Sequence, residues 1–101
     1  MGYKGSDLGS DFKSWFRKEK KRITDILISK GCTDIQLDYG FYYFSGFFTS
    51  ASGQIYYISS RDWRYSRNDD YLIRTAKNYK DYTGGSNGFV KPEGLAYMNI
   101  K

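Results

Sequence analysis

The strongest constraint on the fold is an amphipathic pattern over residues 10–30, which fits one long helix. Six apolar side chains recur at the spacing of a single helix face: Phe12, Trp15, Phe16, Ile23, Ile26 and Leu27. Basic side chains fill the opposite face: Arg17, Lys18, Lys20, Lys21 and Arg22. Ser10 or Asp11 can cap the N-terminus, and Gly31 suits a left-handed stop at the C-terminus. We therefore expect a helix with a packed apolar face and a solvated basic face.

The segments that follow predict β-strands. Residues 33–39 alternate apolar and polar side chains, as a half-buried strand does. Residues 40–50 are aromatic on both faces, and residues 54–60 form the return strand after a hairpin loop at 50–53. A run of strands after one helix favours an α+β fold, in which the N-terminal amphipathic helix packs on a three- to five-stranded antiparallel sheet.

The C-terminal third of the sequence leaves more alternatives open. Residues 71–80 fit a helix capped by Asn68 or Asp69, or a strand with Ile73 and Thr75 on one side and Leu72 on the other. We favour the strand, because it continues the meander after residues 54–60. TGGSNG at residues 83–88 predicts a flexible loop, and GLAYMNIK at residues 94–101 predicts a short terminal strand.

Composition argues against most kinds of catalytic site. The chain of 101 residues contains no His and one Cys, so the commonest general base, the commonest metal ligand and a cysteine-based zinc site are missing. The sequence therefore predicts a protein that is not an enzyme and needs no metal or organic cofactor. We expect one domain over residues 1–101, with residues 1–9 as a flexible lead-in, and no membrane-spanning segment.

Charge and aromatic content point instead to binding. The formal net charge is +5, and aromatic residues make up 20% of the chain. Residues 32–60 contain no Lys or Arg, so the positive charge lies in the two ends of the sequence. Such a distribution allows attraction to a polyanion, although the excess of positive charge is modest for a nucleic-acid-binding protein.

The best candidate for a contact surface is the segment RDWRYSR, residues 61–67. Arginine can form forked hydrogen bonds to carboxylate or phosphate, and aromatic rings can stack on a partner. Trp and Arg are also the residue types most often found as interface hot spots. The predicted binding residues are Arg61, Trp63, Arg64, Tyr65, Arg67 and Tyr43. The basic helix face, residues 17–22, is predicted to be a secondary surface that steers association.

The segment LIRTAKNYKDYTGGSNGFV, residues 72–90, resembles a recurring stretch in small uncharacterised proteins of phages and mobile elements. Proteins of that origin include anti-CRISPR and other anti-defence inhibitors, which act by occupying a surface of a host effector. The resemblance implies a small non-enzymatic protein that binds and inhibits a nucleic-acid-handling complex in the host cytoplasm. The alternative from the residues themselves is a basic, aromatic-rich module that binds RNA or DNA directly.

Overall fold

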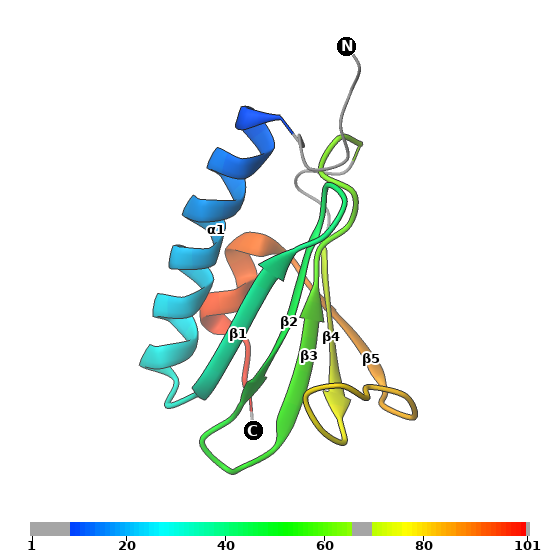
Figure 1. Ribbon diagram of the computed structural model, residues 1–101. Helices are drawn as coiled ribbons and strands as arrows, with labels where there is room; N and C mark the ends of the chain where they lie inside the picture. Colours follow the sequence, from blue (N-terminus) through cyan, green and yellow to red (C-terminus); the bar gives the residue numbers. More distant parts are fainter. Residues whose placement is uncertain (1–8, 66–69, 101) are drawn as a thin grey trace.

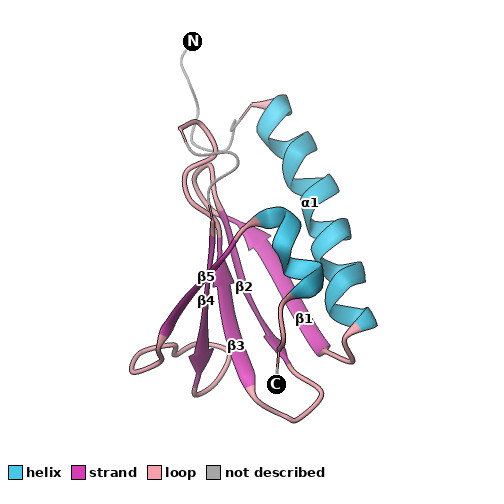
Figure 2. Cartoon of the chain, turned by 180° about the vertical axis from the view of Figure 1, so that it is seen from behind, coloured by secondary structure: helices cyan, strands magenta, loops and turns pink. Residues whose placement is uncertain are grey.

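The computed structural model describes residues 9–65 and 70–100, which form one helix, a five-stranded sheet and a short 3-10 helix. The elements in chain order are α1 (Ser10–Ser29), β1 (Thr33–Tyr39), β2 (Phe44–Thr49), β3 (Ile55–Ser59), β4 (Tyr71–Ala76), β5 (Asn87–Val90) and η1 (Pro92–Tyr97). The strands pair antiparallel in the order β1-β2-β3-β4-β5, and α1 and η1 cover the same face of the sheet (Figures 1 and 2). The predicted α+β fold is confirmed.

The core lies between the sheet and the two helices. From α1, the side chains of Phe12, Phe16, Ile23 and Leu27 are buried, and Trp15 and Ile26 pack against them. The inner face of the sheet adds the other large buried side chains: Leu37, Phe44, Phe48, Ile58, Tyr71 and Ile73. Alternation along each strand follows from the pleat, which sends successive side chains to opposite faces.

One charged side chain of α1, that of Glu19, is partly buried at the edge of this core. Glu19 accepts hydrogen bonds from Nε and Nη2 of Arg22, at 3.0 and 2.9 Å, and another from the hydroxyl of buried Tyr71. These partners satisfy both carboxylate oxygens, so the charge can lie in the apolar interface. The contact also ties α1 to β4.

The two ends of α1 differ in how closely they follow the prediction. At the C-terminus, Gly31 has a φ of 83°, and the amide of Cys32 donates to the carbonyl of Leu27 at 3.0 Å. This is the expected left-handed stop, and it buries Cys32 against Leu27. At the N-terminus, Gly9 occupies the cap position with no side-chain hydrogen bond, so the expected cap by Ser10 or Asp11 is wrong.

Residues 71–76 form strand β4, which confirms the strand prediction for this segment. Two other predictions for the C-terminal third are wrong. The predicted loop at 83–88 ends early, because Asn87 and Gly88 pair with Arg74 and Ile73 in the sheet. The predicted terminal strand is replaced by η1, which begins at Pro92 and buries Leu95 in the core. Proline has no amide hydrogen to contribute to a ladder, and its fixed φ suits the first turn of a helix.

The face of the sheet away from α1, here called the outer face, is partly covered by the loop at residues 77–86 (Figure 1). The Tyr79 hydroxyl lies 2.6 Å from Oγ1 of Thr49 and donates to the carbonyl of Asp34 at 2.8 Å. The ring of Tyr82 stacks on Tyr57 with 4.0 Å between centroids. These contacts hold the loop at residues 77–86 against the outer face of β1, β2 and β3.

Candidate functional site

The connection between β1 and β2 is a tight turn that places aromatic side chains at one end of the sheet. The amide of Gly40 donates to the carbonyl of Tyr43 at 2.8 Å. Tyr42 has a φ of 62°, a left-handed conformation that bulky residues adopt only where the surroundings hold them. Its ring lies 5.4 Å from that of Phe12, and its carbonyl accepts the amide of Trp63 at 2.7 Å. The turn is thereby fixed to α1 and to residues 61–65.

The guanidinium of Arg64 lies at the centre of this end of the molecule. Its carbon lies 5.0, 4.4 and 5.1 Å from the centroids of three rings: Phe41, Tyr42 and Tyr65. Nε and Nη2 donate to the two carboxylate oxygens of Asp62, at 3.1 and 2.7 Å. These hydrogen bonds lower the pKa of Asp62 and raise that of Arg64. The sequence predicted forked hydrogen bonds from this guanidinium to a partner, but in the structure the guanidinium is paired with Asp62 of the same chain.

Trp63, one of the predicted binding residues, is half-buried. Its ring lies 5.8 Å from the ring of Phe12 and 6.4 Å from that of Trp15, and it packs against the core. Part of its area thus stabilises the fold, and a contact between its remaining area and a partner stays a prediction.

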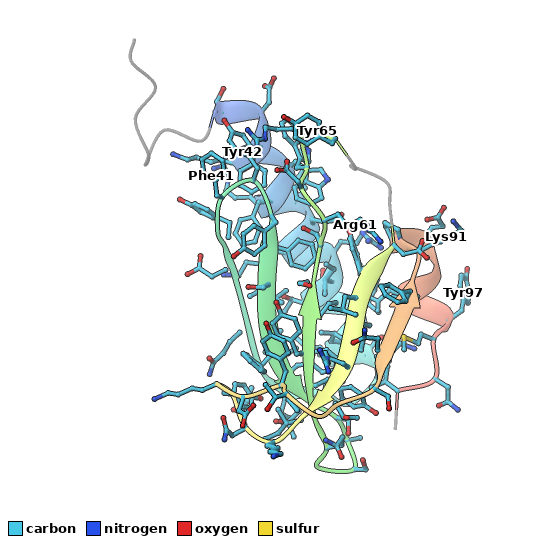
Figure 3. The ribbon with its side chains drawn as sticks, turned by 90° about the vertical axis from the view of Figure 1, so that its right-hand side faces the viewer. Phe41, Tyr42, Arg61, Tyr65, Lys91 and Tyr97 are labelled. Atoms are coloured by element: carbon cyan, nitrogen blue, oxygen red, sulfur yellow. The ribbon has the colours of Figure 1, made fainter. Side chains whose placement is uncertain are left out.

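The most exposed rings of this end are Phe41, at 50%, and Tyr65, at 79%, with Tyr43 exposed beside them. Phe41, Tyr42 and Tyr65 gather at the same end of the molecule (Figure 3). An open hollow of about 450 Å³ adjoins them between the start of α1 and Trp63. We call this surface the aromatic end and define it by Phe41, Tyr42, Tyr43, Trp63, Arg64 and Tyr65.

The structure separates Arg61 from the aromatic end. Arg61 lines a different hollow, on the outer face near Leu72 and Phe89, and Figure 3 shows it beside Lys91 and apart from Phe41 and Tyr65. Arg67, the remaining predicted residue of this segment, lies outside the described residues, as do Asn68, Asp69 and most of the predicted lead-in.

The predicted basic face of α1 lies on the solvent side of the helix. Arg17, Lys18 and Lys20 are exposed, and none of the three forms an ion pair within residues 9–65 and 70–100. Lys21 pairs with Asp25 at 2.9 Å, and Arg22 is half-buried with Glu19. Of the five predicted basic residues, three therefore have no charged partner in the described chain.

Three residues of this arrangement are not among the predicted binding residues: Asp62, which pairs with Arg64, and the rings of Phe41 and Tyr42. Asp62 accepts the amide of Arg64 at 2.9 Å through Oδ1, a side-chain turn that Asp adopts readily and that its place two residues before Arg64 signals. Phe41 and Tyr42 were expected within a strand, although Gly40 signalled the turn that holds them. Their place beside Arg64 depends on how two loops meet in space.

The arrangement offers contacts rather than reactive groups. Within the described ranges, no three His, Cys, Asp or Glu side chains lie together so that they could hold a metal ion. Cys32 is buried, and burial raises the pKa of its thiol, which disfavours the nucleophilic thiolate. No helix within residues 9–65 and 70–100 is long and apolar enough to cross a membrane.

Comparison of the chain with models of protein families, with curated proteins and with solved structures found no match in any of the three.

Proposed function

We propose that this protein is a small, non-enzymatic interaction protein that binds a partner protein through the aromatic end. The observation that carries the proposal is the exposure of Phe41 and Tyr65 beside an Arg64 side chain that is already fixed by Asp62. Exposed rings held in place can bury a large area in an interface with a small loss of side-chain entropy. The fixed guanidinium supports this use, because it orders the rings before a partner arrives.

The resemblance of residues 72–90 to phage and mobile-element proteins supports a more specific role. We infer an inhibitor that occupies a surface of a nucleic-acid-handling complex in a host cell. Residues 72–90 span β4, the loop over the outer face and β5, which lie outside the aromatic end. The resemblance therefore bears on the origin of the protein, whereas the aromatic end supplies the contact.

The basic face of α1 supports a second candidate function, direct binding of RNA or DNA. Arg17, Lys18 and Lys20 are exposed and lack charged partners within the described residues, so they are able to contact phosphates. The two candidates differ in their response to salt. Phosphate binding weakens by roughly 0.7–0.9 log units per log unit of salt for each phosphate neutralised, and an interface built on aromatic rings weakens much less.

A capture experiment tests the protein-binding role. The immobilised protein is exposed to a nuclease-treated lysate of the cell that carries the gene, and the affinity of the captured protein is then measured. The double substitution Phe41→Ala with Tyr65→Ala should weaken binding at least about thirtyfold, the loss expected for hot-spot residues. Tyr97→Ala is the matched control, because Tyr97 is 88% exposed on η1.

Each variant is first checked for an unchanged melting temperature. Equal losses from Tyr97→Ala and the double variant would contradict a contact at the aromatic end. Gel shifts with single- and double-stranded nucleic acid, repeated over a salt series, complete the test. A steep salt slope that falls by about 0.7–0.9 in Lys20→Ala, together with full retention by the double variant, would favour the nucleic-acid-binding candidate.

A further inference from the structure

A second hollow lies on the outer face, near the ends of β3, β4 and β5. It measures about 200 Å³ and is lined by Ser59, Ser60, Arg61, Asp70, Leu72 and Phe89. In the sheet, Ser59 lies opposite Leu72, and Leu72 lies opposite Phe89, so these three side chains form one row across the outer face. We call this site the β5 hollow; its volume is that of one large side chain rather than of an organic cofactor.

Two of the residues that line the β5 hollow, Leu72 and Phe89, are apolar. Phe89 is 56% exposed although it lies in the middle of a strand, and Leu72 beside it is half-buried. An exposed Phe on a sheet face is costly to keep in water, and a partner side chain that enters the hollow would remove both residues from solvent.

The rim of the β5 hollow carries excess positive charge. Arg61 is exposed and forms no ion pair within the described part of the chain. Asp70, the carboxylate that lines the site among the described residues, pairs with Nζ of Lys91 at 3.6 Å. Figure 3 shows Arg61 and Lys91 on the same side of the molecule. The hollow thus joins two apolar side chains to a guanidinium that has no charged partner in the described part of the chain.

We propose that the β5 hollow binds an acidic segment of a protein partner, with an apolar side chain of that segment on Phe89 and Leu72 and a neighbouring carboxylate on Arg61. Asp70 favours a peptide over a nucleic acid. Its carboxylate can accept a backbone N–H of a peptide, whereas the sugar-phosphate backbone of DNA offers no hydrogen-bond donor. The proposal does not depend on the aromatic end, because the two surfaces share no lining residue.

The test is an NMR titration of the isotope-labelled full chain with capped pentapeptides. Asp-Asp-Phe-Asp-Asp should shift the amide signals of Leu72, Phe89 and their neighbours. The peptide with Ala in place of Phe should bind less tightly, and so should the peptide with Lys in place of Asp. In Arg61→Glu the affinity should fall at least about fivefold, since reversing the charge turns an exposed attraction into a repulsion. Phe89→Ser should lower it by a similar factor.

The matched control is Lys80→Glu, which makes the same charge reversal on the exposed side of the loop at 77–86 and should leave the affinity unchanged. The spectrum of each variant shows directly whether it is folded. The proposal is overturned if the acidic peptide shifts no signal around the hollow, or if Lys80→Glu weakens binding as much as Arg61→Glu. It is also overturned if an oligothymidylate binds the same residues more tightly than the peptide does.

Discussion

Two arginines of this chain stack on tyrosine rings, but in opposite settings. Arg64 lies over exposed rings at the aromatic end and pairs with Asp62. Arg74 lies 5.4 Å from the ring of Tyr82 beneath the loop at 77–86, and its Nη2 donates to the carbonyl of Gly85 at 2.6 Å. One cluster faces solvent, and the other fastens a loop onto the sheet.

The difference lies in what covers each cluster. Near Arg74, Phe47 and Tyr57 lie opposite each other on the outer face of β2 and β3, with 5.3 Å between ring centroids. The ring of Tyr82, from the loop at 77–86, packs over them. Around Arg64, Phe41 and Tyr65 stay exposed. Similar residue types therefore serve packing where a described loop covers them, and present exposed rings where they lie at the aromatic end.

The largest expected effect comes from the ring on which the aromatic end rests. Phe12 is fully buried and contacts both Tyr42 and Trp63. Phe12→Ala should lower the free energy of unfolding by about 3–5 kcal/mol, because it leaves a cavity in the core. The same substitution at half-exposed Phe41 should cost less than about 1 kcal/mol. Urea denaturation of the two variants measures both values, and similar losses would show that the aromatic end is part of the core.

The second-largest expected effect is a difference in stability between substitutions of two tyrosines, each of which contacts an arginine. Tyr82→Ala removes the stack on Tyr57 and should destabilise the protein by about 1–2 kcal/mol, because aromatic pairs add to the area that they bury. Tyr65→Ala should change stability by no more than about 0.5 kcal/mol, since that ring is largely exposed. Limited proteolysis should cleave Tyr82→Ala faster than wild type within residues 77–86. Equal cleavage would mean that the stack does not fasten the loop.

The helix and the first strands were predictable because their signal repeats along the sequence. The apolar positions of α1 recur over five turns, so errors at one residue do not change the pattern. Glu19 breaks that pattern, and its partner Tyr71 lies 52 residues away, which no local pattern reveals. Likewise, β5 begins within a Gly-rich segment, because pairing with β4 outweighs a weak strand propensity.

The sequence indicates which residue types form the candidate site, but it does not indicate how their side chains are arranged. The segment at 61–67 was predicted to be a contact surface, and its Arg64 and Tyr65 are exposed. That Arg64 pairs with Asp62, and that Arg61 faces Phe89 instead, depends on how the loop turns at Asp62. Side chains adjacent in sequence can diverge at a turn, whereas periodicity fixes direction only within helices and strands.

The smallest expected effect is a shift in the pKa of one carboxyl group near each arginine, Asp62 beside Arg64 and Asp81 in the loop that covers Arg74. At the aromatic end, hydrogen bonds from Arg64 lower the pKa of Asp62 below its ordinary value of 3.8. In the loop at 77–86, the hydroxyl and amide of Thr83 lower the pKa of Asp81 in the same direction. Both carboxylates therefore favour the folded state above the ordinary pKa, and this contribution is lost as the pH falls through the lowered pKa.

Titration of the two carboxyl carbons by NMR separates the causes. Arg64→Gln should return the pKa of Asp62 toward its ordinary value and leave that of Asp81 unchanged, while Thr83→Ala should do the reverse. Added salt should raise the pKa of Asp62 more than that of Asp81, because the main partner of Asp62 is a charged guanidinium, whereas the main partner of Asp81 is neutral Thr83 and the charge of Lys77 has the smallest effect. An Asp62 pKa that does not respond to Arg64→Gln would mean that the guanidinium is not held by Asp62 in solution. Arg64 would then be available to a partner, as the sequence alone suggests.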